Sequence, residues 1–474
     1  MSRVVVAGAG LAGHEVVRRL LADPAFDGTI TWHAGEPGHP YNRVLLTDLL
    51  AGRHAPSAIE LPTLTDPRLI YRNTQLRSIA KADFDHLVIA TGAEAVIPPV
   101  RGNTVALRTL ADVRTILAEL NADGNLDETA RRDTRSRGEA NQDTGSGIAQ
   151  TDRPPLAGAR GETNGETGSG ATPTGGVPLF GGRARSGARG EATREAGSGS
   201  GMAQLGRSVL AGLGGRRHAA TRRVAVVGGG PLGVETACAL ASRGIRVELL
   251  HRGPHVLSRW LDAESGALLA GSLAQAGITV HCDTDVSAIT GGIWPTADLV
   301  ILACGAQPRV GLARAAGLPV GRGILVDSSG RSLGDERIFA VGDCAQSVDR
   351  PSGALAALDD ARRAAFSIVN GFSPLPAAPP PLRLRTYGIP GADVAVMGRP
   401  RPEASIQFTD QRRRTRKVLV LDGDVPVAAA LVGDVGAAAA LARAIARPTA
   451  PAPQSPAALL TSGAGRGAGG FDGT

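Results

Sequence analysis

The sequence predicts an α/β protein built on two mostly parallel sheets, because one strand, glycine-rich turn and helix pattern occurs twice. The first copy runs from the apolar strand at 4–6 into Gly8-Ala9-Gly10-Leu11-Ala12-Gly13. The second runs from the strand at 224–227 into Gly228-Gly229-Gly230-Pro231-Leu232-Gly233. An amphipathic stretch follows each turn. This is the pattern of a Rossmann-like dinucleotide-binding domain, so we expect two of them.

The glycines of such a turn have separate tasks. The first allows the bend, the second lets the backbone approach a diphosphate, and the third lets the helix pack closely on the strand. The helix N-terminus adds free N–H groups and a partial positive charge. We therefore predict dinucleotide contacts at six glycines: Gly8, Gly10, Gly13, Gly228, Gly230 and Gly233. Taken alone, either turn could equally be an ordinary glycine- and alanine-rich loop.

Three later strands end in residues that suit a ligand edge. One ends in Ala90-Thr91-Gly92 and another in Ala303-Cys304-Gly305, with glycine where the backbone must pass close to another group. A third apolar strand leads through Gly342 to Asp343. Ligands of open α/β sheets bind at the carboxyl ends of the strands. We therefore expect Asp343 to accept hydrogen bonds from ligand hydroxyls, such as those of a flavin's ribityl chain.

The order of these motifs resembles the two-domain flavoprotein reductases of the FAD-dependent pyridine nucleotide-disulfide oxidoreductase superfamily. Two further stretches look like the flavin part of the NAD(P)H nitrite reductase large subunit and of the assimilatory nitrate reductase electron-transfer subunit. They are 41–47 (YNRVLLT) and 382–398 (LRLRTYGIPGADVAVMG), with a closing LVGD at 431–434. The resemblance covers roughly 1–120 and 222–445. It implies FAD in the first domain and NADPH or NADH in the second.

This resemblance and the composition together predict the domain organisation. An FAD-binding domain comprises 1–110 and 318–372, an NAD(P)-binding domain comprises 111–120 and 222–317, and a small α+β reductase domain comprises 380–447. The segment 121–221 is rich in Gly, Arg and Thr and poor in apolar residues, so we expect a long disordered insertion there, followed at 448–474 by a disordered tail. An inert linker is the favoured interpretation of the insertion, and a partner-binding tail is the alternative.

Further cofactor contacts are predicted at the ends of strands. Glu36 follows the second strand at a distance suited to a carboxylate on the FAD ribose, although relatives tend to have the acid where Gly35 stands. In the second domain the corresponding strand ends in His251-Arg252 instead of an acid, which favours the 2′-phosphate of NADPH over NADH. Arg252 could also be a solvated surface residue.

The resemblance implies several more cofactor-binding residues. Arg43 is similar to the family's arginine near the flavin diphosphate, and Glu235 to its glutamate near the nicotinamide. The alternative role for Glu235 is that of a first-turn acid that complements the helix dipole. The resemblance also extends to the strand ends, where it implies four more cofactor-binding residues: Thr91, Gly92, Gly305 and Gly342. Many relatives place a lysine near the flavin where this chain has Asp48. We assign no catalytic residue.

Cysteine usage and hydropathy exclude several classes of protein. Cys238, Cys282, Cys304 and Cys344 form no Cys-x-x-Cys pair, so we expect buried thiols and no metal site. Residues 36–52, where disulfide-reducing relatives carry their thiols, contain no cysteine. No apolar run reaches membrane-spanning length, and the first strand begins at once, so we expect a cytoplasmic protein without a membrane partner.

Charge points to an acidic redox partner. The chain carries a net charge of +7, with nine Lys or Arg against three Asp or Glu between 383 and 417. Such a stretch could steer an acidic iron–sulfur protein or a nitrite or nitrate reductase subunit, or it could be a solvated loop. Three functions remain: a reductase for nitrite or nitrate reduction, a ferredoxin or rubredoxin reductase of a monooxygenase system, and a non-catalytic nucleotide-sensing flavoprotein that binds a partner or nucleic acid. A homodimer is compatible with each, and nucleic acid is not an expected partner.

Overall fold

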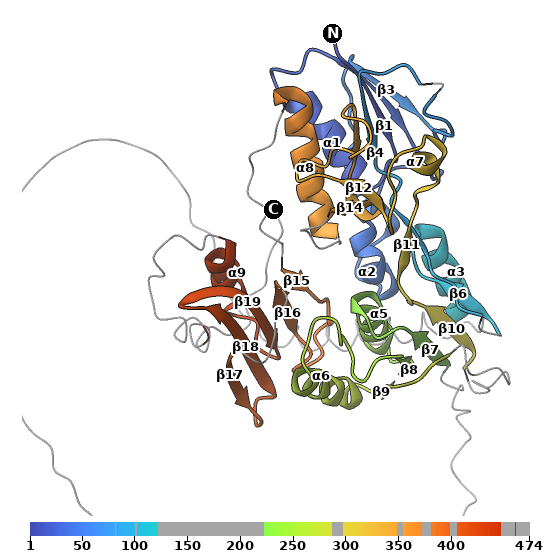
Figure 1. The fold of residues 1–474 in the computed structure, drawn as a ribbon. Helices are drawn as coiled ribbons and strands as arrows, with labels where there is room; N and C mark the ends of the chain where they lie inside the picture. Colours follow the sequence, from blue (N-terminus) through green and yellow to red (C-terminus); the bar gives the residue numbers. More distant parts are fainter. Residues whose placement is uncertain are drawn as a thin grey trace, which may run out of the picture. The chain divides into compact units, whose positions relative to one another are not determined.

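The computed structural model describes residues 1–80, 82–99, 102–121, 222–286, 297–347, 354–371, 381–398 and 405–446, together with Leu460. The predicted disordered insertion and tail lie almost wholly outside these residues. Within them the chain forms three sheets of five strands and two small sheets of two strands (Figure 1). The predicted α/β fold with two parallel sheets and a C-terminal α+β part is confirmed.

The first sheet is parallel throughout and has the strand order β13-β4-β1-β2-β3. Its strands are β1 (Arg3–Ala7), β2 (Thr29–His33), β3 (Leu69–Arg72), β4 (His86–Ile89) and β13 (Ile338–Ala340). Most residues of β1 and β4 are buried, as is typical of parallel strands between two layers. Helices α1 (Leu11–Ala22) and α8 (Ala354–Asn370) pack against each other beside this sheet (Figure 1). The alanines of α8 in this core, at 357, 361 and 364, allow the close approach.

The second sheet repeats this design with the order β6-β10-β7-β8-β9. Its strands are β6 (Thr104–Ala106), β7 (Arg223–Val227), β8 (Arg246–Leu250), β9 (Ile278–His281) and β10 (Leu299–Leu302). Three helices accompany it, α3 (Leu110–Asn121), α5 (Pro231–Ala241) and α6 (Ala263–Gln275). The sheet includes β6, although the predicted domain boundary lies later, at residue 110. Arg222 donates a hydrogen bond to the carbonyl oxygen of Glu119, so the two sides of the segment 122–221 lie next to each other.

The C-terminal sheet is antiparallel, with the order β15-β16-β19-β18-β17. Its elements are β15 (Leu382–Arg383), β16 (Val394–Met397), β17 (Ser405–Asp410), β18 (Thr415–Asp422), β19 (Val425–Val432) and α9 (Ala438–Ala446). One face packs on α9 and Leu460 through Met397 and Leu419. The other face, with Val396 and Val418, joins the core of the second parallel sheet.

Short elements connect the sheets. They are β5 (Ala93–Ala95) paired with β11 (Ala306–Pro308), β12 (Ile324–Val326) paired with β14 (Ala345–Ser347), the helices α2 (Leu46–Leu50) and α7 (Gly311–Ala315), and the 3-10 helices η1 (Arg43–Leu45), η2 (Pro56–Ile59) and η3 (Gly342–Cys344). The β5–β11 pair joins the segments that follow the two predicted strand-end glycines. None of the described helices combines the length and the apolar character needed to cross a membrane.

Candidate functional site

The first glycine turn lies between β1 and α1, and its glycines differ in what surrounds them. Gly8 has a φ of +121°, and a Cβ there would overlap the carbonyl oxygen of Ala90. A Cβ at Gly13 would overlap the carbonyl oxygen of Gly8. At Gly10 the nearest atom to a Cβ would be Nε of Arg43, 4.0 Å away. The turn itself therefore requires the first and third glycines, whereas the second leaves open space at the N-terminus of α1.

The second turn, between β7 and α5, has the same geometry. Gly228 has a φ of +116°, and a Cβ there would overlap the carbonyl oxygen of Ala303. A Cβ at Gly233 would overlap Gly228, while a Cβ at Gly230 would meet nothing within 4 Å. Each turn thus presents an unobstructed helix N-terminus, which is the arrangement that binds a diphosphate. The residues present fit two dinucleotides.

The predicted diphosphate arginine stands beside the first turn. The Arg43 guanidinium pairs with the carboxylate of Glu36 and donates to the carbonyl oxygen of Arg108 at 3.1 Å. The Tyr41 hydroxyl donates to Oε2 of Glu36 at 2.8 Å. Burial opposes ionisation of Glu36, yet the hydrogen bonds from Arg43 and Tyr41 hold its pKa below the usual value. Glu36 therefore orients Arg43, and its contact with a ribose stays a prediction.

A cavity of about 370 Å³ opens at the carboxyl end of the first sheet. Gly342 and Asp343 line it, and the Asp343 carboxylate pairs with the guanidinium of Arg108. The same arginine donates to the carbonyl oxygen of Ala93 at 3.3 Å. Asp343 thus lies where the sequence predicts, with a cation beside it. Arg108 was not among the residues predicted from the sequence, although its place two residues after β6 puts it at a ligand edge.

The predicted strand-end residues are also placed near this region. The Thr91 hydroxyl donates to the carbonyl oxygen of Arg309 at 2.8 Å, next to Gly92, whose φ is +68°. In the second domain Gly305 has a φ of +102°. Each strand-end motif begins with an alanine, Ala90 or Ala303. Gly8 packs closely against the carbonyl group of Ala90, and Gly228 packs in the same way against that of Ala303. Each strand-end motif therefore supports its own glycine turn.

The end of β8 carries the predicted nucleotide-selecting residues. Nδ1 of His251 accepts a hydrogen bond from the Gly229 backbone N–H at 3.2 Å, and its Nε2 lies 3.3 Å from the Ser258 hydroxyl. Burial lowers the pKa of His251, and the nearby charges of Arg252 and Arg259 lower it further. His251 therefore braces the turn as a neutral ring, while both arginines are exposed. Arg259 was not among the residues predicted from the sequence.

Glu235 lies one turn into α5, buried against two other segments. The backbone N–H of Arg385 donates to its Oε1 at 2.9 Å, and the Thr47 hydroxyl donates to its Oε2 at 3.4 Å. Burial raises the pKa of Glu235, and Asp48 adds to this effect. The Glu235 carboxylate is therefore held by contacts from outside its own helix. An acid that only complemented the helix dipole would not need these contacts.

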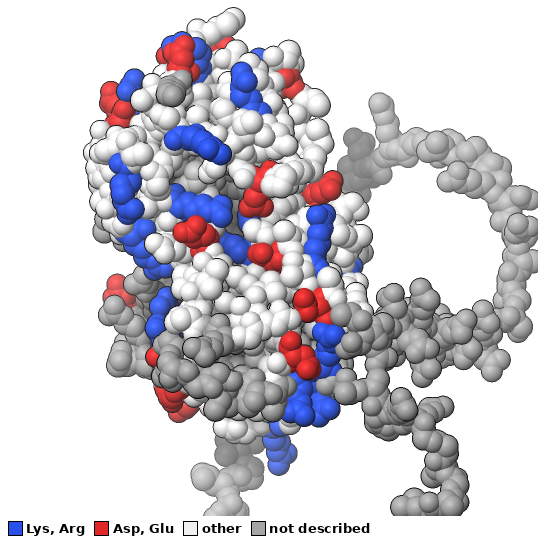
Figure 2. Space-filling view, turned by 90° about the vertical axis from the view of Figure 1, so that its right-hand side faces the viewer, with Lys and Arg blue, Asp and Glu red and all other residues white. Residues whose placement is uncertain are grey.

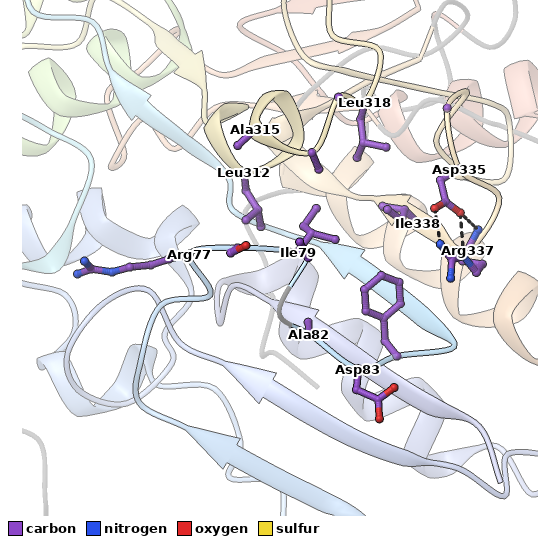
Figure 3. A pocket seen from close by; sticks show the side chains of 16 residues that line it. Arg77, Ile79, Ala82, Asp83, Leu312, Ala315, Leu318, Asp335, Arg337 and Ile338 are labelled. Atoms are coloured by element: carbon purple, nitrogen blue, oxygen red, sulfur yellow. Dashed lines mark hydrogen bonds and ion pairs between the residues drawn. The ribbon is translucent and has the colours of Figure 1, made fainter.

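A larger cavity, of about 520 Å³, lies at the opposite end of the first sheet (Figure 3). Ile79, Leu312 and Ile338 line it together with Asp335, which pairs with Arg337. No predicted site residue lines this cavity. It therefore takes no part in the candidate dinucleotide sites.

The cysteine expectation holds for two of the four residues. Cys238 and Cys344 are buried, and burial raises the pKa of both thiols. Cys282 and Cys304 are half-buried instead, because each follows a strand where the chain leaves its sheet. Among the described residues no group of His, Cys, Asp and Glu could hold a metal ion.

The basic C-terminal stretch is only partly at the surface, which corrects its interpretation as a continuous docking surface. Arg416 and Lys417 are buried, because β18 is an inner strand of its sheet. Lys417 pairs with Asp434 at 2.7 Å. Arg412 and Arg413 remain exposed. On the face shown in Figure 2, Lys and Arg side chains are interspersed with Asp and Glu, so that face carries no uniform basic patch either.

Comparison with known proteins identifies similar families. Residues 186–361 match the family model described as pyridine nucleotide-disulphide oxidoreductase. Over 226 residues the chain is 30% identical to a nitrite reductase [NAD(P)H] of Bacillus subtilis, covering 45% of this chain and 28% of that protein. It is 28% identical to the assimilatory nitrate reductase electron transfer subunit of the same organism, covering 45% and 29%. The chain therefore spans less than a third of these relatives' length.

Solved structures share the fold over nearly the whole chain. The covalent putidaredoxin reductase–putidaredoxin complex has a TM-score of 0.65 at 20% identity, covering 98% of this chain and 99% of that one. An NADH:rubredoxin oxidoreductase from Clostridium acetobutylicum has a TM-score of 0.62 at 17% identity, covering 97% and 99%. These identities support the shared fold alone.

Proposed function

We propose that this chain is an FAD-dependent NAD(P)H oxidoreductase of the pyridine nucleotide-disulphide oxidoreductase superfamily, whose model it matches over residues 186–361, and that it passes electrons to a separate redox protein. The observation that carries the proposal is the paired geometry of the two glycine turns. In both, the first and third glycines are required by the protein's own packing, and the second leaves space for a ligand. Two such sites in one chain suit two dinucleotides that exchange electrons.

FAD, when bound, would accept a hydride from the nicotinamide and return electrons singly or in pairs to an acceptor. The residues of this chain bind and orient it. Arg43 stands beside the diphosphate turn, with Glu36 and Tyr41 fixing its guanidinium. Arg108 and Asp343 line the cavity at the sheet edge, where they would offer a hydrogen-bond donor and an acceptor to a bound flavin.

NADPH is the proposed reductant. No acid follows the end of β8, and two exposed arginines, Arg252 and Arg259, lie close to His251. A guanidinium pairs well with a 2′-phosphate, whereas the free ribose of NADH gives it no charged partner.

The proposed acceptor is a nitrite or nitrate reductase subunit or its iron–sulfur carrier, as suggested by the nitrite and nitrate reductase relatives. A ferredoxin-type carrier of an oxygenase system is the second candidate, because the chain is 37% identical over 134 residues to the ferredoxin–NAD(+) reductase subunit of a benzene 1,2-dioxygenase system of Pseudomonas putida. In either case residues 36–52 supply no thiol that could relay electrons between a bound flavin and its acceptor. The exposed Arg412 and Arg413 are available to an acidic carrier.

The test begins with the purified full chain. We expect a flavin absorption spectrum with one FAD per chain, and bleaching of that spectrum by anaerobic NADPH. Gly10→Val should abolish FAD binding without lowering stability much, because its side chain would enter open space. Gly13→Ala is the matched comparison, since its Cβ would overlap backbone and destabilise the fold by about 1–3 kcal/mol. Full FAD occupancy in Gly10→Val would rule out the first turn as the flavin site.

Nucleotide choice has its own test. Arg252→Ala and Arg259→Ala should each weaken NADPH binding about tenfold or more, the effect of losing a charge-assisted hydrogen bond of roughly 1.5–3 kcal/mol. NADH binding should change little in either variant. The measurement is the nucleotide concentration that half-saturates the rate of flavin reduction. Equal losses for both nucleotides, or a native preference for NADH, would refute the NADPH assignment.

A further inference from the structure

Three segments far apart in the sequence meet at a buried ionic cluster. Thr47 and Asp48 come from α2, Glu235 comes from α5, and Arg385 and Tyr387 come from the loop after β15. The side chains of Asp48 and Glu235 are only 7% and 11% exposed. Burying two carboxylates is costly unless a cation compensates them, so the cation here has a defined task.

Arg385 is the cation that contacts both carboxylates. Its Nε lies 3.1 Å from Oδ2 of Asp48, and its Nη1 lies 3.7 Å from Oε1 of Glu235. The backbone N–H of the same residue donates to Oε1 of Glu235 at 2.9 Å. Its Nη1 also donates to the carbonyl oxygen of Val44 at 3.1 Å. One residue thus holds two acids and the backbone of η1.

The cluster links a segment beside the first glycine turn to the helix that follows the second. Val44 follows Arg43, whose guanidinium reaches the Gly10 side of the first turn. Glu235 stands in α5, five residues after Gly230 of the second turn. Arg385 therefore bridges from the flavin-side segment to the nicotinamide-side helix. No other described segment donates a guanidinium to both Asp48 and Glu235.

The backbone beside Arg385 is held in an unusual conformation. Tyr387 has a φ of +55°, a left-handed conformation that bulky residues rarely adopt. Its ring is buried, and the Arg53 guanidinium lies 4.7 Å from the ring centroid. Such strain persists only where surrounding contacts fix it. The loop is therefore a rigid support for the Arg385 side chain.

We propose that Arg385 is a positioning residue of the nicotinamide site, fixing Glu235 and Asp48 between the two dinucleotides so that NADPH binds and reacts in one orientation. The inference rests on the proposed function and assigns part of the second dinucleotide site to the C-terminal segment. The groups that face Glu235 are Asp48 from α2, Arg385 and Tyr387 from the loop, and Cys238 from its own helix.

The experiment uses the full FAD-containing chain with Arg385→Met, Arg385→Lys, Glu235→Gln and the control Arg383→Met. Arg383 is exposed on β15, two residues from Arg385. NADP⁺ binding is measured by titration calorimetry in two buffers of different ionisation enthalpy, which also counts protons taken up. Flavin reduction by NADPH is followed between pH 6 and 9, and thermal unfolding is recorded for each variant.

We expect Arg385→Met to slow flavin reduction about tenfold or more, with partial rescue in Arg385→Lys and no change in Arg383→Met. The rate of flavin reduction should show an inflection with pH where Glu235 titrates. Arg385 lowers the pKa of Glu235, so the loss of Arg385 should move this inflection to higher pH. Glu235→Gln should abolish that inflection and the linked proton uptake. If Arg385→Met only lowers the melting temperature, leaving rate, inflection and proton uptake unchanged, the positioning role is refuted. A native chain that holds no FAD or is not reduced by NADPH would instead refute the proposed function.

Discussion

At the scale of single residues, buried side chains join segments of the first dinucleotide unit through short polar contacts. His14, in the first turn of α1, is buried, and its Nε2 lies 2.8 Å from the carbonyl oxygen of Pro62. Its ring also packs edge-on against Trp32, with centroids 5.8 Å apart. Burial lowers the pKa of His14, as it does for His86 and His251. The folded chain therefore favours the neutral form of all three rings.

This preference predicts acid sensitivity. The unfolded histidines take up protons at a pH near 6.5, whereas the folded ones resist protonation until lower pH. The stabilisation is therefore complete above about pH 6.5 and is lost as the pH falls towards the folded pKa values. His14→Gln keeps a donor for Pro62 and removes one such group. We expect urea unfolding at pH 7.5 and 5.5 to show a smaller loss of stability on acidification in His14→Gln than in the native chain.

The control for this measurement is His54→Gln, which removes an exposed histidine. If His14→Gln and the native chain lose the same free energy of unfolding between these two pH values, burial of His14 does not contribute to the acid sensitivity.

At the scale of elements, charged side chains join strands to helix termini. Asp262 caps α6 by accepting from the Ser265 N–H at 2.8 Å. The buried Arg416 of β18 lies 3.3 Å from the same carboxylate and also pairs with Glu264. It donates to Thr409 of the edge strand β17 at 2.9 Å. A residue expected at a docking surface is therefore a structural link between the C-terminal sheet and α6.

Arg416→Met should destabilise the chain by about 1–3 kcal/mol, because the mostly shielded Asp262 carboxylate loses its cation, whereas Glu264 and Thr409 stay exposed to water. The double variant Arg412→Gln with Arg413→Gln should keep native stability, since both side chains are exposed. It should slow reduction of an acidic protein acceptor several-fold at low salt and leave ferricyanide reduction unchanged. Chemical unfolding and stopped-flow rates at two salt concentrations measure these effects. A native-like stability of Arg416→Met would contradict the assigned link.

At the scale of the whole molecule, distant parts of the chain complete each site. Asp343 and Arg108, which pair at the cavity beside the carboxyl end of the first sheet, are 235 residues apart in sequence. Glu235 and Arg385 are 150 residues apart. The segment 122–221 interrupts this arrangement in sequence, yet Arg222 contacts Glu119. The two dinucleotide units are thus joined by contacts that do not require the intervening residues.

Replacing residues 125–218 with a short Gly-Ser linker should therefore leave FAD content, NADPH reduction and melting temperature close to native. Shortening a loop whose ends already meet changes closure entropy only modestly. Flavin absorbance and thermal unfolding of the shortened chain provide the measurement. Loss of FAD or of flavin reduction would assign the segment a functional role and end its interpretation as an inert linker.

The sequence alone determined the two sheets and their glycine turns, because these depend on local rules. A residue with φ near +120° must be glycine, a strand buried on both sides is continuously apolar, and a helix begins where its N-cap leaves the backbone extended. Gly8, Gly10 and Gly13 and their counterparts in the second domain could therefore be located from spacing, as could Asp343 at a strand end.

Only the tertiary structure decided which charges face one another. Arg108 carries no motif, and nothing near Arg385 in sequence indicates that it would compensate Asp48 and Glu235. Likewise the run of arginines at 412–416 looks uniformly solvated until the sheet places Arg416 inside. Ion pairing and burial depend on distances between residues far apart in the chain. Those distances exist only once the sheets have packed.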